Sequence, residues 1–441
     1  MSARNSLLAI GGAIGCLVML FCVGMLIVAA LFVAPALSFS FPVVNRIAYL
    51  DNENNIRLVD ARGENPVAIT RDASSARLYT FPTFAPNSQS IAFMGIAGAP
   101  TQREGALYAA PIAGGAATIV FKSATDFPFY LYWAPDNQRI TFLTQSEKEM
   151  ALMVGYADGK QTARTLETGA PLYWAWSPDS QALFLHAGGS RRDSPRARLA
   201  FLRGDNAQTL DPGPAGFQAP QFSPDGAAIL YAASDARGQD GLYAADAHGS
   251  RPRLISNYRG RIAFAWAPDG NALAWIVTPA SIRLPHFGAV DLSAKDGSNP
   301  ARIVAEDALA FFWSPDSQKI AYLTIVRAGE EQNCAECSRA PGVAAPLEQD
   351  ALRLRWRVVT VADRQTKILA TFSPTAEFLT LLPFFDQYAR SLTFWSPDSA
   401  QFVYTQRDGN TDQASVWIAN VSGDAKPRRI GDGALAVWSW R

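Results

Sequence analysis

The chain has 441 residues, of which 39 are basic and 39 acidic, so its formal net charge at pH 7 is zero. This balance excludes the overall positive field with which many proteins attract nucleic acid, and we expect no nucleic-acid partner. Only three histidines and four cysteines occur. The sequence therefore offers few side chains for a centre built on histidine or cysteine.

The N-terminal region carries a long apolar segment. No charged residue lies between Arg4 and Arg46, and residues 7–33 are almost wholly apolar. A helix of this length exceeds the roughly 30 Å hydrocarbon core of a membrane. We predict a cytoplasmic N-terminus at 1–6, a transmembrane anchor at 7–33 and a linker at 34–43, with the remainder of this cell-membrane protein outside the cytoplasm. The alternative is a signal peptide that is cleaved to release a secreted protein.

A short motif recurs seven times after the linker. It consists of Ser or Ala, then Pro, then Asp or Asn, and it always follows an aromatic residue, as in Trp176-Ser177-Pro178-Asp179. Proline presets φ for a type I turn, and its polar neighbours hydrogen-bond the nearby backbone. Successive motif prolines lie 49, 43, 46, 44, 47 and 82 residues apart, and a period of this size indicates a repeat architecture. The motif prolines are Pro86, Pro135, Pro178, Pro224, Pro268, Pro315 and Pro397.

Each repeat predicts four short antiparallel strands. Apolar residues alternate after the motifs, as in Ile140-Thr141-Phe142, and Asp158-Gly159 separates two further apolar runs. Such alternation is typical of a strand, and Asp-Gly between apolar runs indicates a hairpin. Four strands in about 45 residues match one blade of a β-propeller, in which stacked blades bury the faces of their sheets. We therefore predict an all-β propeller over residues 44–441, with the motif aromatics packed in its core.

The two ends of this region predict how the ring closes. Residues 46–50, 56–59 and 67–69 form three strand-like runs without an aromatic strand before them, and residues 434–440 supply such a strand at the C-terminus. We therefore predict eight four-stranded blades, closed by the C-terminal strand joining the first blade. Seven blades are the alternative if the poorly patterned stretch 184–210 does not form a full blade.

The repeated motif, from Phe84 onward, resembles the TolB-like β-propellers, which carry the bacterial Pro-Asp variant of the WD-type repeat. The resemblance covers roughly residues 43–441 and implies the fold. TolB has fewer blades than we predict here, so the resemblance is not extended to the partners of TolB.

The long insertions are predicted to gather on one face. Strand parity places the loops at 188–195 and 279–287, an insert at 327–350 and an inter-blade link at 372–391 opposite the Pro-Asp turns. Loops on a rigid scaffold often carry function, so we hypothesise that this face binds a protein, peptide or glycan of the cell envelope. Alternatively, the arginines of these loops are exposed to solvent and the aromatic residues of the link cap the end of the propeller. The candidate binding residues are Arg191, Arg192, Arg196, Phe384, Phe385, Asp386 and Tyr388.

Two kinds of side chain raise the question of metals and redox chemistry. Cys334 and Cys337 lie in the insert, where a disulfide is the favoured interpretation; a metal site, redox chemistry and free thiols are the alternatives. The acidic clusters at 51–55 and 408–412 contain ligands suited to Ca²⁺, although ordinary hairpin turns explain them better. We therefore assign no metal ligand and no cofactor.

No catalytic motif emerges. The chain has neither a Gly-x-Ser-x-Gly elbow nor a His-Glu-x-x-His pair. We therefore favour a binding or scaffolding module over an enzyme, and we assign no catalytic residue. The alternative is a propeller hydrolase or lyase with a metal-assisted site at the central channel.

Overall fold

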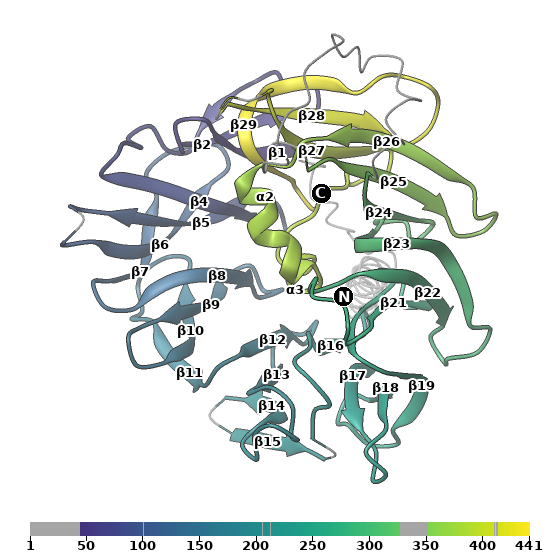
Figure 1. Ribbon diagram of the computed structural model, residues 1–441. Coiled ribbons are helices and arrows are strands. Elements are labelled where there is room, and N and C mark those ends of the chain that lie inside the picture. Colours follow the sequence, from purple (N-terminus) through teal and green to yellow (C-terminus); the bar gives the residue numbers. More distant parts are fainter. Residues whose placement is uncertain are drawn as a thin grey trace, which may run out of the picture. The chain divides into compact units, whose positions relative to one another are not determined.

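The computed structural model describes residues 45–441 except residues 100, 205, 212, 327–351, 410 and 412. In this part of the chain, antiparallel sheets surround a central axis, which confirms the predicted all-β propeller (Figure 1). The predicted anchor at 7–33, the linker at 34–43 and the insert with Cys334 and Cys337 lie outside the described residues. Within the described ranges, no helix is both long enough and apolar enough to span a membrane.

Four sheets contain four strands each. Their strands follow one another in sequence order, so each sheet is a meander joined by short turns. The weakly patterned stretch 184–210 contributes strands to the third of these sheets. The strands are β4 (Arg77–Phe84), β5 (Ser90–Ala97), β6 (Glu104–Pro111) and β7 (Thr118–Ser123); β8 (Phe127–Trp133), β9 (Arg139–Gln145), β10 (Met150–Tyr156) and β11 (Arg164–Thr168); β12 (Leu172–Trp176), β13 (Leu183–Ala187), β14 (Arg198–Arg203) and β15 (Asn206–Leu210); and β16 (Gln221–Phe222), β17 (Ala228–Ser234), β18 (Asp240–Asp246) and β19 (Arg253–Tyr258).

A fifth sheet has seven strands in sequence order. Its long central strand pairs with the preceding strand through Ala301 and with the following strand through Trp313. The strands are β20 (Arg261–Trp266), β21 (Ala272–Thr278), β22 (Gly288–Ala294), β23 (Ala301–Trp313), β24 (Lys319–Ile325), β25 (Leu354–Thr360) and β26 (Thr366–Phe372).

The sixth sheet joins the two ends of the described chain. Its strands are β1 (Arg46–Asp51), β2 (Ile56–Asp60), β3 (Val67–Ala68), β27 (Gln401–Arg407), β28 (Ala414–Asn420) and β29 (Arg428–Trp438). Strand β29 pairs with β28 and then with β1, where Ile47 lies opposite Trp438 and Leu50 opposite Leu435. The indole Nε1 of Trp438 also donates to Asn45 Oδ1 at 2.7 Å. The predicted pairing of the C-terminal strand with the first strands is confirmed.

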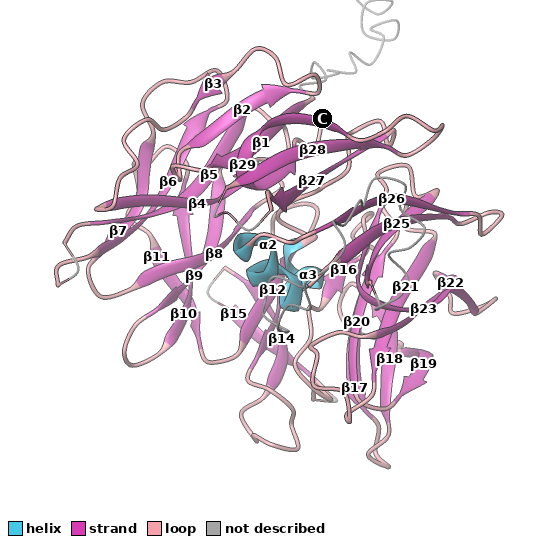
Figure 2. Cartoon of the chain, turned by 45° about the horizontal axis from the view of Figure 1, so that its top comes forward, coloured by secondary structure: helices cyan, strands magenta, loops and turns pink. Residues whose placement is uncertain are grey.

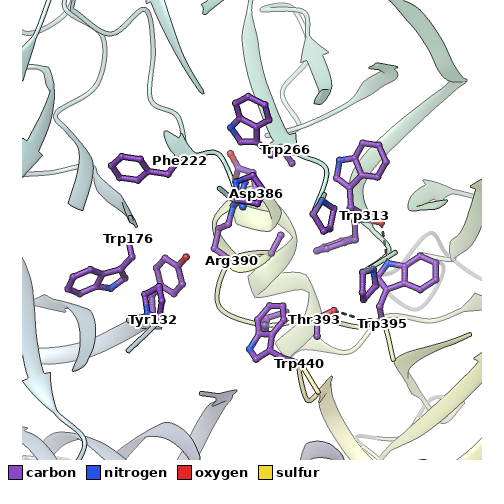
Figure 3. A pocket seen from close by; sticks show the side chains of 18 of the residues that line it. Tyr132, Trp176, Phe222, Trp266, Trp313, Asp386, Arg390, Thr393, Trp395 and Trp440 are labelled. Atoms are coloured by element: carbon purple, nitrogen blue, oxygen red, sulfur yellow. Dashed lines mark hydrogen bonds between the residues drawn. The ribbon is translucent and has the colours of Figure 1, made fainter. Parts of the chain in front are cut away.

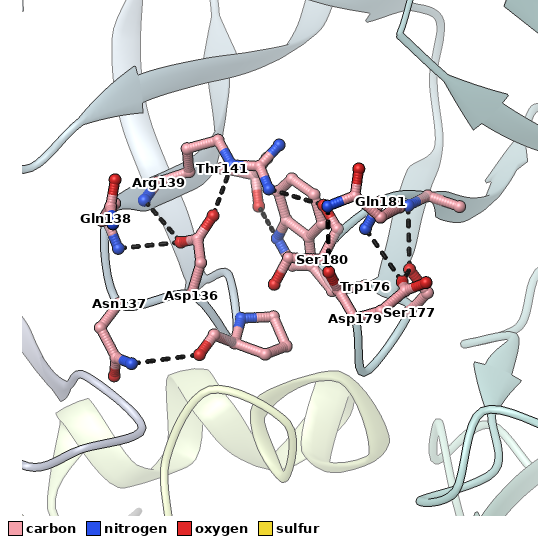
Figure 4. Close-up of polar contacts among 12 residues, drawn as sticks. Asp136, Asn137, Gln138, Arg139, Thr141, Trp176, Ser177, Asp179, Ser180 and Gln181 are labelled. Carbon is pink, nitrogen blue, oxygen red and sulfur yellow. Dashed lines mark hydrogen bonds and ion pairs between the residues drawn. The ribbon is translucent and has the colours of Figure 1, made fainter. Parts of the chain in front are cut away.

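The motif turns have one local structure (Figure 4). In the turn at residues 177–180, Ser177 Oγ accepts a hydrogen bond from Ala182 N at 2.9 Å, and Asp179 Oδ1 accepts one from Gln181 N at 3.0 Å. Ser180 has φ 60°, the left-handed region that Gly226 and Gly270 occupy at the same place in other motifs. Glycine suits this position because it lacks a Cβ. Serine also occurs here because a short polar side chain tolerates a positive φ.

Most motif aromatics are buried between neighbouring sheets. Trp133 and Trp395 are 2% and 1% exposed, and their indole Nε1 atoms donate to the carbonyl oxygens of Thr83 and Phe312 in the preceding sheet. Burial of such rings contributes a large part of the hydrophobic stabilisation. The predicted core role of these aromatics is thus confirmed.

The link between β26 and β27 is helical, although the sequence analysis treats it as a loop. It contains α2 (Ala376–Leu381), the 3₁₀ helix η3 (Leu382–Phe384) and α3 (Phe385–Tyr388). These helices lie at the centre of the ring of strands (Figure 2). Thr375 caps α2 by accepting a hydrogen bond from Phe378 N at 3.3 Å, and Glu377 is in the first turn, where a negative charge is favourable.

Candidate functional site

A cavity of about 470 Å³ lies in the central channel, between the motif turns and α3 (Figure 3). Six motif prolines surround its mouth, and several of them are exposed to solvent, so the cavity opens on the face that carries the Pro-Asp turns. Its walls are mainly aromatic. The aromatic wall consists of Tyr132, Trp176, Phe222, Trp266, Phe311, Phe312, Trp313, Trp395 and Trp440.

The helical link crosses the channel and forms the floor of this cavity. At one side, Thr375 Oγ1 donates to Ala434 O on β29 at 2.6 Å. At the other side, the hydroxyl groups of Tyr130 and Tyr173 donate to Gln387 O at 2.9 and 3.2 Å. Contacts therefore fix the link from both sides of the channel.

Aromatic packing holds the same link in place. The ring of Phe385 lies 5.4 Å from that of Phe311, and Tyr388 stacks on Phe81 at 5.6 Å. Phe81 has φ 51° and lies at a bulge in β4, between Thr80 and Thr83, where the register shifts. Bulges re-aim side chains, and this one carries a ring that contacts the link.

Two charged side chains of the link line the cavity. Asp386 is 6% exposed, and its Oδ1 atom has no hydrogen-bond donor among the described residues. Burial raises the pKa of this carboxyl to about 7, while the nearby Arg390 acts in the opposite sense. Burial thus favours the neutral form of this carboxyl.

Arg390 is partly exposed and is oriented by a buried glutamine. Its Nη2 atom donates to Gln221 Oε1, which also accepts from Trp266 N at 3.2 Å. Gln221 Nε2 donates to Phe264 O at 2.6 Å, which fixes the direction of the amide. In the described part of the chain, Arg390 has no carboxylate partner within ion-pair distance.

The cavity wall also carries two unusual indoles. The Nε1 atoms of Trp266 and Trp313 are buried without an acceptor among the described residues. Trp440 Nε1, by contrast, donates to Phe84 O at 3.2 Å, as two other indoles do to neighbouring sheets. Buried donors without acceptors are rare in native proteins, and they often mark functional sites.

The structure separates the predicted binding residues of the link. Phe385 and Asp386 line the cavity, and Tyr388 is buried beside Tyr130, with ring centroids 5.1 Å apart. Phe384 is 46% exposed and does not line the cavity.

The predicted arginines lie elsewhere, in the loop between β13 and β14. Arg192 forms an ion pair with Asp240 at 2.6 Å and so connects its sheet to the next one. Arg191 Nη1 donates to Pro195 O at 2.6 Å, whereas the side chain of Arg196 is exposed. None of the three lines the cavity, and a binding role for them stays a prediction.

The loop at 279–287 and the link, two of the predicted long loops, contact each other. The ring of His286, from the loop at 279–287, contacts the edge of Phe385 at 5.0 Å. Burial lowers the pKa of His286 to about 4. An apolar groove of about 210 Å³ runs between this loop and the link, and its walls include Leu284, Leu352 and Leu379. This groove, between two of the predicted long loops, is smaller than the channel cavity.

Metal-binding side chains do not cluster in the described part of the chain, where no group of three or more His, Cys, Asp or Glu is placed to hold an ion. In the first acidic cluster, Asp51 Oδ1 accepts from the backbone of Glu53 and Asn55 at 3.0 and 2.8 Å, as in an ordinary hairpin turn. Calcium binding, the less favoured interpretation of these clusters, is not tested. His186 is buried between Gly189 O and Gln218 N, and burial lowers its pKa to about 4.

Arg390 and Gln221 are functional candidates that the sequence alone does not indicate. The signal for Arg390 was indirect: Thr375 followed by Glu377 is a helix start, and a helix in this link would have placed Asp386 and Arg390 one turn apart. Gln221 gives no signal, because its role depends on a contact with a residue 169 positions away.

Comparison with known proteins supports the fold. No family model matches the chain, and no curated protein does. A solved prolyl endopeptidase structure is similar with a TM-score of 0.50 at 12% identity, covering 82% of this chain and 50% of that one. The oligogalacturonate lyase of Vibrio parahaemolyticus has a TM-score of 0.49 at 12% identity, covering 86% and 97%. TolB of Acinetobacter baumannii has a TM-score of 0.38 at 15% identity, covering 80% and 84%.

These likenesses concern the fold alone, because every identity is far below 25%. Solved structures of TolB proteins are among those to which this chain is similar. The chain is a β-propeller.

Proposed function

We propose that this chain is a membrane-tethered binding module of the cell envelope, whose propeller receives a segment of a partner protein in the channel cavity. The observation that carries the proposal is the cavity itself: about 470 Å³, open beside the Pro-Asp turns and closed by the helical link. Its volume is within the range of about 300–1,000 Å³ that is typical of ligand sites.

The chemistry of the walls favours a peptide segment over other ligands. Aromatic rings supply apolar area against which the side chains of a peptide can pack. Among the residues that line the cavity, only Asp386 and Arg390 can carry a charge, so the walls provide no strong field for a polyanion such as nucleic acid.

We infer that the propeller has eight blades. The long strand β23 is the outer strand of one sheet unit and, further along, the inner strand of the next unit. Strand β29 has the same two roles. Division of the two larger sheets at these strands adds four units to the four separate sheets. In the last unit, Trp395 takes the inner position through its bridge to Phe402.

The membrane anchor and the extracytoplasmic location are also part of the proposal. They rest on the apolar run at 7–33, which contains no charged residue. Alkaline extraction of membranes should leave the full-length chain in the pellet, and external protease should degrade the propeller. If the protein is instead recovered in the soluble fraction without its first residues, the apolar segment is a cleaved signal peptide and not an anchor.

The central test measures peptide binding with and without the cavity. Ala265→Phe places a ring at the wall, at a position that Tyr132 and Phe312 occupy in other sheets, so the strand should accept it. A pool of random octapeptides should bind the full-length wild-type protein, and Ala265→Phe should abolish this binding. Ile119→Phe, at a site 51% exposed on a peripheral strand, is the matched control. Equal binding by all three proteins would contradict the proposal.

A further inference from the structure

The cavity is closed at its inner end. The link spans the channel from Thr375, bonded to Ala434 O at 2.6 Å, to Gln387, bonded by the Tyr130 hydroxyl at 2.9 Å. Tyr130 lies three residues before the motif aromatic Trp133, so the link contacts β8 further from the Pro-Asp turns than that aromatic. A polypeptide that enters at the prolines therefore cannot pass through, and only a turn or a chain end reaches the floor.

The floor presents a cation, Arg390, that has no carboxylate partner among the described residues. Arg390 has five N–H donors, and its guanidinium uses one of them, toward Gln221. Gln221 is 1% exposed and held by Phe264 O and Trp266 N, so it directs the guanidinium without neutralising it. A partly buried arginine with free donors suits a planar anion such as a carboxylate.

The other charged group on the floor opposes an anion only weakly. Asp386 forms no ion pair with Arg390 although both line the cavity. Because burial favours its neutral form near pH 7, the carboxyl can donate a hydrogen bond instead of repelling an anion. The walls above it are apolar, with Phe222 and Phe311 among them.

We propose that the floor binds the free C-terminal carboxylate of a partner chain, with Arg390 as its anchor and the last side chain of the partner packed against the aromatic wall. The proposal rests on the proposed function and adds the end and the chemistry of the bound segment. The closed floor admits only a turn or a chain end, and the Arg390 guanidinium, which has no carboxylate partner among the described residues, favours the end that is negative.

The test compares pools of random octapeptides that differ only at their ends, by isothermal titration of the full-length protein at pH 6.5. We expect N-acetylated peptides with a free C-terminal carboxylate to bind roughly tenfold or more tightly than N-acetylated peptides with a C-terminal amide, since a charge-assisted hydrogen bond is lost in the amide. This comparison needs no variant and so does not depend on how a variant folds.

Variants then locate the carboxylate. Arg390→Gln should reduce binding of the acid pool to that of the amide pool, and Arg390→Lys should retain part of the difference. Arg237→Gln, in an exposed hairpin, should change nothing. If acid and amide pools bind equally well in a manner that Ala265→Phe abolishes, the carboxylate proposal is wrong while the binding function stands.

Two other outcomes are equally decisive. Tighter binding of peptides with a free N-terminus than of acetylated ones would assign the floor to an ammonium group beside Asp386 and overturn the proposal. Absence of binding by every pool would overturn the binding function and this inference together.

Discussion

The hydroxyl of Tyr130 donates a hydrogen bond of 2.9 Å to the carbonyl oxygen of Gln387, 257 residues away in the sequence. Tyr173 donates to the same oxygen at 3.2 Å from the neighbouring sheet. One carbonyl at the end of α3 is thereby held by two sheets. The position of the cavity floor depends on this pair of tyrosines.

Tyr130→Phe should destabilise the protein by about 1 kcal/mol, because a buried hydrogen bond is lost while the ring is kept. The double variant with Tyr173→Phe should cost more than the sum, since Gln387 O then has neither donor. Chemical denaturation measures both. Tyr243→Phe is the control, since the hydroxyl of Tyr243 has no hydrogen bond among the described residues. If all three single changes have an equal effect, the hydroxyl groups of Tyr130 and Tyr173 do not support the cavity floor as proposed.

Closure of the ring predicts an unusually sensitive C-terminus. Trp438 is 1% exposed and lies opposite Ile47 in the pairing of β29 with β1. Trp438→Ala should cost about 3–5 kcal/mol, and Trp438→Phe about 1 kcal/mol through the lost bond to Asn45. Ile119→Ala, at an exposed position, should cost under about 0.5 kcal/mol. Thermal unfolding of the three variants checks this order.

Much of the fold was predictable because it follows from local chemistry. The Ser177-Pro178-Asp179 motif forms the same turn wherever it occurs, and period-two alternation marks the strand that follows it. The pairing of Trp438 with Ile47 was also predictable, since each end lacked what the other supplied. The helices of the link were missed because a short helix in a long link has only a weak signal, here the cap at Thr375.

The site was less predictable. Phe385 and Asp386 were singled out because they lie in a long link, but the link alone does not tell which side of the channel they face. Arg390 is a candidate because it has no carboxylate partner among the described residues and because Gln221 orients its guanidinium. Both properties arise only when the ring is assembled. Such relationships depend on contacts between residues far apart in sequence, which spacing and periodicity do not encode.

In the loop between β13 and β14, one arginine, Arg192, should contribute to the stability of the protein. Arg192 donates to both Asp240 oxygens, at 2.6 and 3.3 Å, and also to Gly238 O. Arg192→Ala should therefore cost about 1 kcal/mol in urea unfolding, in the upper part of the range for exposed ion pairs. Arg196→Ala should change stability by less than about 0.5 kcal/mol. If Arg196→Ala costs more than Arg192→Ala, the loop is held by contacts other than this pair.

His286 should make the protein less stable in acid. Its pKa is lowered from 6.5 to about 4 by burial, so between these pH values the unfolded state binds a proton that the folded state does not. The contribution of the buried neutral His286 to the free energy of unfolding is complete above pH 6.5. It falls as the pH decreases, by up to about 1.4 kcal/mol per pH unit. His286→Phe removes this dependence, and urea unfolding at several pH values measures the difference from wild type. Leu284→Ala, a change of a neighbouring residue that does not titrate, should give a difference independent of pH.

Asp386 should have the opposite effect in almost the same pH range. Its pKa is raised from 3.8 to about 7, so between these values the folded state binds a proton that the unfolded state has lost. The free energy of unfolding should fall as the pH rises from 4 to 7, by up to about 1.4 kcal/mol per pH unit, and then level off. Asp386→Asn keeps the shape of the side chain and removes the titration.

The stability gained by Asp386→Asn over wild type should therefore grow from pH 4 to pH 7 and stay constant above pH 7. Ser391→Ala changes a buried neighbour that does not titrate, and its difference from wild type should not depend on pH. A flat difference for Asp386→Asn as well would mean that water or a counter-charge reaches the carboxyl in solution. The floor would then carry a negative charge at neutral pH, and Arg390 would be less suited to bind a carboxylate there.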